Sequence, residues 1–355
     1  MQYGRHWRLA LAGVLITFYA LALWNSPAKK GGGWGAADQF GYEPDPVGAA
    51  RFLESLDVRF FSDAAPDAME NAEPVDTFLY RAMDAACRER YGKPFAPGRQ
   101  LNGSCVAWGA MHAVYCAESI EWQLGNRSEP PIMPSTESIY GGSRVEARGR
   151  PGDGAKPYGG WSDGSTGYAA AKWLRDWGVI YRQQYDNGID LTTYSKDVEK
   201  QWGAYGNGGR DDGGRFDSVA ARTPCKHVVN VRTWDELVAA ITSGFPVTIA
   251  SSQGFNKTRD ADGFCKAQGT WMHQMCIVGI RFQKMGGGRV GALILNSWGD
   301  YCGGPKWPDD QPDGSFWAEQ KTVERILAQG DSWAIAEVAF EWRDIKHDEW
   351  LGVEQ

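Results

Sequence analysis

The chain has 355 residues, which is longer than one typical domain and long enough to bury a sizeable core. Its formal net charge is −7 and its charged residues are scattered, so the sequence offers no basic stripe of the kind that nucleic-acid binding requires. The 17 tryptophans and 45 glycines indicate a loop-rich body with extensive aromatic packing.

An apolar run at residues 9–24 lies near the N-terminus and has basic residues on both sides. Its length falls between the core of a signal peptide and the roughly twenty residues that a membrane-spanning helix needs. We therefore expect residues 1–26 to be either a signal peptide or an N-terminal membrane anchor, in the second case held through residues 9–24. Both alternatives predict an extracytoplasmic protein, secreted or membrane-anchored.

The next two stretches differ in composition. Residues 27–50 are rich in Gly and Pro, which predicts a flexible linker. Residues 51–97 contain two candidate helices, and we expect them to form either a leader or a structural extension packed on the main body. The main body is expected to span residues 98–345.

The first chemical signal in the main body is Cys105. It opens a stretch without proline that is apolar on nearly every face and continues to about Leu124, which predicts a buried helix. Ser104 is a candidate N-cap, so Cys105 falls in the first turn, where free N–H groups and the helix dipole favour a thiolate. Because the thiolate is the reactive form of cysteine, Cys105 is a candidate nucleophile.

Two later segments supply partners for this thiol. Residues 275–282 and 290–295 are apolar and lie on either side of the glycines at 286–288, which predicts an antiparallel hairpin. His273 precedes the first strand and Asn296 follows the second, so the hairpin brings the two side chains together. His273 can accept the thiol proton, and Asn296 can orient the imidazole by a hydrogen bond.

The order of Cys105, His273 and the run Asn296-Ser-Trp-Gly resembles that of papain-like cysteine peptidases, from about Gly98 to Phe340. The resemblance implies an α+β fold of two lobes, one helical and one β-barrel-like, with the active-site cleft between them. It also implies hydrolysis of peptide bonds in a peptide or protein substrate, with no cofactor.

On this resemblance, the helical lobe spans about residues 98–225 and the β-rich lobe about 226–345. Residues 51–97 stand where family members carry an inhibitory prosegment, so that role is added to the alternative of a structural extension. Residues 186–226 lengthen the distance between nucleophile and histidine beyond the family's spacing and are expected to form a surface insertion.

The resemblance also assigns roles to side chains around the predicted cleft. Gln100 would hold the oxyanion together with the backbone N–H of Cys105, although it lies one position nearer the nucleophile than the family's glutamine. Trp298 would cover the hydrogen bond between Asn and His. Gly167 and Tyr168 would form a substrate-binding wall, with Tyr168 where a second glycine is usual.

The chain contains seven cysteines. The family's bridge near the nucleophile is not expected, because Asn102 and Ser165 stand at its two positions. Our best candidate for a disulfide joins Cys265 and Cys302. Two further cysteines, Cys116 and Cys276, are expected to be buried thiols. No Cys-x-x-Cys pair occurs, so we expect no metal site.

Two other functions are compatible with the same sequence. One is a non-catalytic peptide-binding protein on a papain-like scaffold, which the displaced Gln100 and the unusual Tyr168 would suit. The other is an enzyme acting on a different amide, such as a transpeptidase or a cell-wall amide hydrolase, which the predicted export would suit. The oligomeric state cannot be predicted from these residues.

Overall fold

A computed structural model of the chain describes residues 40–148, 163–186, 188–210, 212, 214–282, 288–343 and 345. The predicted signal peptide or anchor at residues 1–26 lies outside these ranges, so export stays a prediction. Within the described ranges, the helices are too short or too polar to span a membrane.

Helices dominate the first two thirds of the described chain. They are α2 (Pro46–Glu54), α3 (Phe61–Ala64), α4 (Pro66–Asn71), α5 (Tyr80–Tyr91), α6 (Cys105–Gln123), α7 (Thr136–Arg144), α8 (Gly167–Asp176), α9 (Lys196–Tyr205) and α10 (Arg215–Ala220). Two more helices, α11 (Trp234–Thr242) and α12 (Gln320–Leu327), lie among the strands in sequence.

The strands form one antiparallel sheet. They are β1 (Thr77–Phe78), β2 (His227–Asn230), β3 (Val247–Phe255), β4 (Ala267–Arg281), β5 (Gly291–Leu295), β6 (Phe316–Glu319) and β7 (Ser332–Ala336). Their order in the sheet is β2-β7-β3-β4-β5-β6, and β1 pairs with the long central strand β4. All of these strands except β1 come after residue 226, as the predicted α+β architecture requires.

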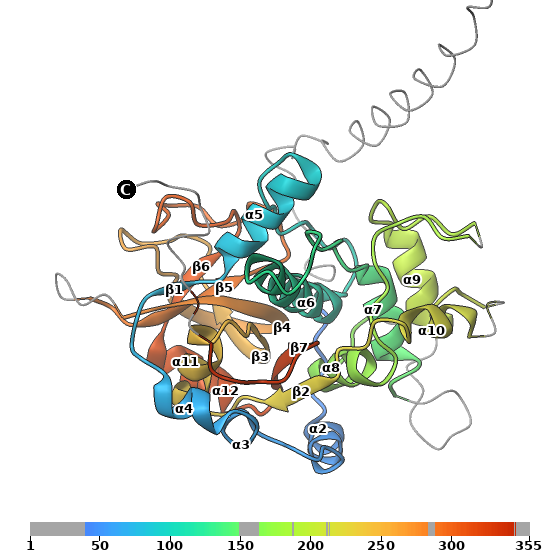
Figure 1. The fold of residues 1–355 in the computed structure, drawn as a ribbon. Helices are drawn as coiled ribbons and strands as arrows, with labels where there is room; N and C mark the ends of the chain where they lie inside the picture. Colours follow the sequence, from blue (N-terminus) through green and yellow to red (C-terminus); the bar gives the residue numbers. More distant parts are fainter. Residues whose placement is uncertain are drawn as a thin grey trace, which may run out of the picture. The chain divides into compact units, whose positions relative to one another are not determined.

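Helix α6 is the central element of the helical part. Nearly all of its residues are buried, which agrees with the apolar pattern on every face. It packs against β4 and β3 of the sheet and against α5, α7 and α8. Figure 1 shows α7, α8, α9 and α10 gathered on one side of α6, with strands β3 to β6 toward the other. The first turn of α6 lies next to the sheet, because the side chain of Gln274 in β4 donates to the carbonyl of Val106.

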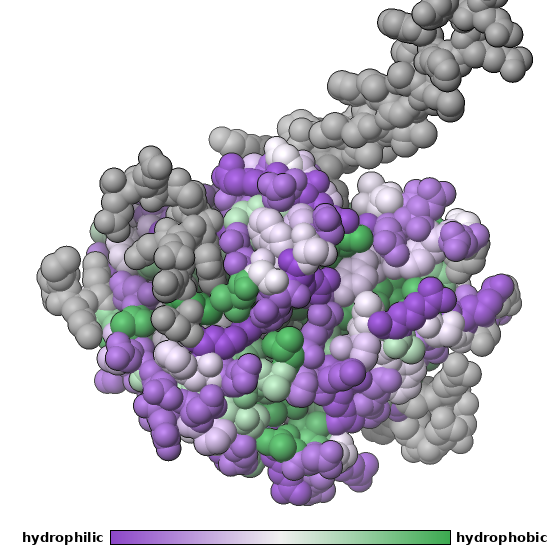
Figure 2. All heavy atoms as spheres, in the orientation of Figure 1, coloured by the Kyte–Doolittle hydropathy of each residue, from purple (hydrophilic) through white to green (hydrophobic). Residues whose placement is uncertain are grey.

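The face of the molecule shown in Figure 2 is mostly hydrophilic, with hydrophobic side chains gathered in its lower centre. This distribution agrees with the scattered charges in the sequence.

Two sequence-based expectations about the periphery need correction. Residues from Phe40 onward, within the expected linker 27–50, are ordered against the body, and helix α2 begins at Pro46 because Asp45 caps it. The expected surface insertion 186–226 contains α9, which packs against α7 and buries Trp202 and Glu199. Part of that segment is therefore packed into the body, while other described residues of it are exposed.

Candidate active site

Cys105 is the first residue of α6, as the sequence predicts, and it is fully buried. Ser104 occupies the N-cap position, but its side chain makes no capping hydrogen bond. The N–H of Gln274, in β4, points at the sulfur instead, with 3.4 Å between backbone nitrogen and Sγ. The Gln274 side chain also donates to the carbonyl of Val106 at 3.0 Å, so β4 is fixed to the first turn of α6.

A glycine allows this close contact between helix and strand. A Cβ atom at Gly109 would lie 2.9 Å from the Gln274 side chain and 3.1 Å from the carbonyl of Met275. A larger residue would push the first turns of α6 away from β4. Since Gln274 follows His273 in the sequence, the docking of β4 brings His273 close to the first turn of α6.

His273 and Asn296 meet as the predicted hairpin requires. Strands β4 and β5 pair with Cys276 opposite Leu295, and beyond this ladder His273 Nε2 lies 2.7 Å from Asn296 Oδ1. Trp298 covers the pair, with its ring centroid 4.5 Å from that of the imidazole. The other imidazole nitrogen, Nδ1, is buried and has no hydrogen-bond partner among the described residues, so it can receive a proton.

Burial shifts the ionisation of both Cys105 and His273 in this state. Burial raises the pKa of Cys105 to about 12, although the backbone N–H groups of Gln274 and Gly41 lower it in part. Burial also lowers the pKa of His273 to about 4, against the hydrogen bond with Asn296. Burial therefore favours the neutral form of both groups.

The cause of this burial is a short stretch that passes over the nucleophile. We call residues 40–45 the crossing segment. The N–H groups of Gly41 and Tyr42 both donate to the carbonyl of Met272, at 3.2 and 3.1 Å. On the opposite wall, Ser165 donates to the carbonyl of Gly41 and accepts from the N–H of Glu43, each at 2.8 Å. The crossing segment thus pairs with both walls above Cys105.

We call residues 100–104, which precede Cys105, the nucleophile loop. The crossing segment lies so close to this loop that glycine is needed at the contact. A Cβ atom at Gly41 would lie 1.8 Å from the carbonyl oxygen of Gly103, and one at Gly103 would lie 2.8 Å from the carbonyl oxygen of Phe40. The Phe40 ring packs edge-on against Trp298 and His273, with centroids 5.7 and 6.1 Å away. The crossing segment therefore covers both the thiol and the histidine.

Gln100 lies beside the site. Its backbone N–H donates to the carbonyl of Ser297 at 2.8 Å, and its side-chain oxygen accepts from the Ser297 hydroxyl. One hydrogen of its amide group goes to the carbonyl of Asn102 at 3.0 Å. The second amide hydrogen is the one that an oxyanion could use, so a role for Gln100 stays a prediction.

Gly167 and Tyr168, the residues predicted to form the cleft wall, do not pair with the crossing segment through their backbone; Ser165 does. The N–H of Gly167 donates to Asp331 at 3.0 Å and is not turned toward the crossing segment. Tyr168 donates to Asp45 at 2.9 Å and so contacts the end of the crossing segment. Ser165, two residues before Gly167, is the residue that pairs with the crossing segment. Sequence reasoning did not identify Ser165, Gln274 or Met272, because their contributions come mainly from backbone groups.

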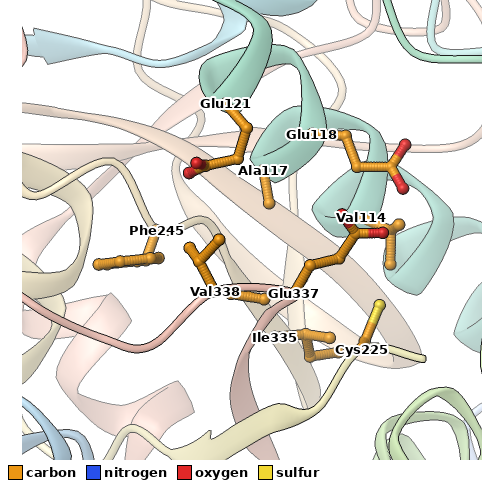
Figure 3. A pocket seen from close by; sticks show the side chains of 10 residues that line it. Val114, Ala117, Glu118, Glu121, Cys225, Phe245, Ile335, Glu337 and Val338 are labelled. Atoms are coloured by element: carbon orange, nitrogen blue, oxygen red, sulfur yellow. The ribbon is translucent and has the colours of Figure 1, made fainter. Parts of the chain in front are cut away.

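A small cavity lies farther along α6 and does not belong to this site (Figure 3). It measures about 10 Å³, room for roughly one water. Its wall includes Glu118, whose pKa burial raises to about 8, with nearby Glu337 adding to the shift. Tyr181 donates to the Glu118 carboxyl at 2.5 Å. Elsewhere in the described ranges, no cluster of three His, Cys, Asp or Glu side chains could hold a metal ion.

Comparison with known proteins shows which solved structures this chain is similar to. No family model matches the sequence, and no curated protein matches it. Among solved structures, xylellain, a cysteine protease from Xylella fastidiosa, is similar with a TM-score of 0.53 and 18% identity, over 85% of this chain and 97% of that one. Procathepsin L 3 of Tenebrio molitor aligns at 0.46 and 14%, over 84% and 83% of the two chains. Procathepsin B S9 from Trypanosoma congolense aligns at 0.48 and 11%, over 85% and 87%.

The similarity to xylellain confirms the predicted α+β fold of two lobes. At this level of identity the similarity concerns the fold, and the chemistry has to be argued from the residues of this chain.

Proposed function

We propose that this chain, built on the fold of papain-like cysteine proteases, is a cysteine peptidase that hydrolyses peptide bonds through Cys105 and His273. The observation that carries the proposal is the contact between Gln274 N–H and the Cys105 sulfur, because it sets the residue next to His273 against the nucleophile. The hydrogen bond from Asn296 fixes the ring so that Nδ1 stays available.

The steps follow from these positions. His273 Nδ1 takes the proton of Cys105, and the thiolate attacks the carbonyl carbon of the peptide. The Cys105 backbone N–H and the second amide hydrogen of Gln100 stabilise the oxyanion of the tetrahedral intermediate. The imidazolium then protonates the leaving amine, and the acyl group stays on the sulfur. His273 next activates a water that releases the acid and restores the thiol.

The crossing segment has to leave before a substrate can bind. It pairs with Met272 and Ser165, the backbone groups that an extended peptide would use. Its departure admits water, which removes the burial that keeps Cys105 and His273 neutral, so an ion pair can then form. We therefore propose that the chain is latent while residues 40–45 stay in place.

The test uses the full chain carrying Gly41→Leu, since that side chain cannot be accommodated beside Gly103. We expect hydrolysis of an unstructured peptide reporter, and a loss of roughly 1,000-fold or more when Cys105→Ala is added, with unchanged circular dichroism. Hydrolysis that survives Cys105→Ala would contradict the proposal. Peptide binding without turnover would favour a non-catalytic scaffold, and turnover of cell-wall fragments alone would favour an enzyme for a different amide.

A further inference from the structure

Two cysteine sulfur atoms lie close together outside the proposed active site. Cys265 Sγ and Cys302 Sγ are 3.2 Å apart, and each residue is 2% exposed. The sequence predicted a disulfide between them, but both are free thiols in this structure. The two side chains are therefore adjacent and not bonded.

The backbone around the pair is already in register. Thr258 and Gly303 form a parallel bridge, the N–H of Gly303 donates to Lys257 at 3.0 Å, and the N–H of Arg259 donates to Gly303 at 2.8 Å. Cys265 is held from the other side by its N–H bond to Trp317 at 2.9 Å. A disulfide requires a sulfur separation of about 2.05 Å, so closure needs a movement of about 1 Å.

One of the two thiols is poised to ionise. The hydrogen bond between the sulfurs lowers the pKa of Cys302, and the guanidinium of Arg259 acts in the same direction. Arg259 is fixed near the pair by hydrogen bonds to the carbonyls of Pro305 and Ser315, at 3.0 and 2.7 Å. A negative charge on this pair is thus stabilised by both a thiol and a fixed cation.

A cavity borders one member of the pair. It measures about 700 Å³ and Cys265 forms part of its wall. The remaining wall carries five basic and two acidic side chains, namely Arg259, Lys266, Arg289, Lys321 and Arg325 with Asp260 and Glu319. The excess of positive charge suits an anionic molecule.

We propose that Cys265 and Cys302 form a redox-active pair, which a small anionic disulfide of the oxidised glutathione type converts into a disulfide bridge. The thiolate of one cysteine attacks one sulfur of the reagent, forms a mixed disulfide and releases the first reagent thiolate. The other cysteine loses its proton and attacks the protein sulfur of the mixed disulfide, which releases the second reagent thiolate. The protein loses two electrons and two protons, and the reagent gains them as two thiols.

The disulfide bridge would act on the proposed active site through Trp298, which covers His273. It closes a loop from Cys265 to Cys302 that contains both His273 and Asn296. Tyr301, the neighbour of Cys302, packs on Trp298 with 5.0 Å between ring centroids. Oxidation would therefore hold Trp298 over the histidine and resist unfolding of the whole hairpin.

The experiment uses the full chain with Cys105→Ala, so that neither the nucleophile nor peptidase activity affects the result. After incubation with oxidised glutathione, we expect mass spectrometry to show one cross-link between Cys265 and Cys302 with a loss of two hydrogens. The oxidised protein should have a Tm higher by roughly 5–10 °C. Amide hydrogen exchange at residues 298–303 should be slower.

Two comparisons sharpen the test. The buried thiols Cys116 and Cys276 serve as an internal control and should stay alkylatable after unfolding. Oxidation by anionic glutathione disulfide should be about tenfold faster than by cationic cystamine, and Lys321→Gln with Arg325→Gln should reduce that preference. A pair that stays reduced, a mixed disulfide that never closes, or a bridge without a Tm shift would overturn the proposal. An equal rate with cystamine would overturn the role of the cavity.

Discussion

Two short stretches of backbone lie against Cys105, and they are fastened differently. The crossing segment, residues 40–45, pairs with both walls over the sulfur through backbone hydrogen bonds to Met272 and Ser165, and it has further side-chain contacts such as the hydrogen bond from Tyr168 to Asp45. The nucleophile loop, residues 100–104, is held by buried side chains. Asn102 in this loop donates to the Lys196 carbonyl at 2.8 Å and to the Glu199 carboxyl at 2.9 Å.

The nucleophile loop has a second support from the same carboxyl group. Tyr194 donates to Glu199 at 2.7 Å and accepts from the N–H of Leu101 at 3.2 Å. Glu199 itself is fully buried in α9. Backbone pairing at the walls can be exchanged for the same pairing with another extended chain, whereas a buried side-chain network cannot. The first stretch is therefore replaceable, and the second is a fixed part of the site.

The largest predicted effect comes from breaking the first attachment. Gly41→Leu in the full chain should expel the crossing segment, because its Cβ would meet the backbone oxygen of Gly103. Iodoacetamide should then alkylate Cys105 on the order of 100-fold faster. Once water reaches the site, the pKa of Cys105 should fall and that of His273 should rise, so alkylation should persist at pH 6.

Gly303→Ala is the matched control for this variant. Its Cβ would lie 4.0 Å from the nearest described atom outside its chain neighbours, so it should leave the slow alkylation of the parent unchanged. If Cys105 in the parent already reacts as fast as in Gly41→Leu, the crossing segment does not protect it. The distinction between the two stretches would then fail.

Breaking the second attachment should lower activity, whereas breaking the first should raise the reactivity of Cys105. Glu199→Leu removes the acceptor for both Asn102 and Tyr194, so the loop that carries Gln100 loses its support. Tested together with Gly41→Leu, it should lower kcat roughly 10- to 100-fold and change KM little, because the oxyanion forms only in the transition state. Asn102→Ala should give a similar loss, and the two substitutions should not be additive.

Two variants separate this effect from a loss of stability. Glu199→Gln keeps an acceptor oxygen and should retain most of the activity. Gly203→Ala, in the same helix, would place its Cβ 2.6 Å from Tyr140 and so destabilise the contact between α9 and α7 without touching the loop. An equal fall in kcat for Gly203→Ala would mean that Glu199 contributes only to folding.

The parts of the site differ in how well the sequence predicted them. The helix that begins at Cys105 and the hairpin were predictable because each has a local pattern, an apolar run after Ser104 in one case and two apolar strands around glycines in the other. The meeting of His273 with Asn296 follows from the register of that hairpin. Similarity to xylellain then confirms the fold that these patterns implied.

The crossing segment had no such pattern. It lies in a stretch rich in Gly and Pro, whose composition is also that of a linker, and the hydrogen bonds that pair it with both walls are backbone bonds to residues far along the chain. The role of Glu199 could not be predicted for a related reason, since a single acidic residue in an insertion is usually at the surface. Its burial depends on Asn102 and Tyr194, which only the tertiary structure brings together.

The smallest predicted effect concerns the pH dependence of stability. Burial raises the pKa of Glu199 to about 8, with Glu137 adding to the shift, against about 4.3 for an exposed glutamate. The folded state therefore binds this proton more tightly than the unfolded state. The resulting stabilisation is complete below about pH 4 and is lost as the pH rises through 8, so the free energy of unfolding should fall between pH 5 and pH 9.

Glu199→Gln tests this dependence, because glutamine is neutral throughout that range and still accepts from Asn102. Urea unfolding at pH 5, 7 and 9 should show that the substitution reduces the decline by on the order of 1–3 kcal/mol, whereas the exposed Glu129→Gln should leave it unchanged. If the decline is as steep with glutamine at 199, the carboxyl is ionised in the folded protein at neutral pH. The nucleophile loop would then be held by a buried charge, and Glu199→Gln would no longer be expected to preserve kcat.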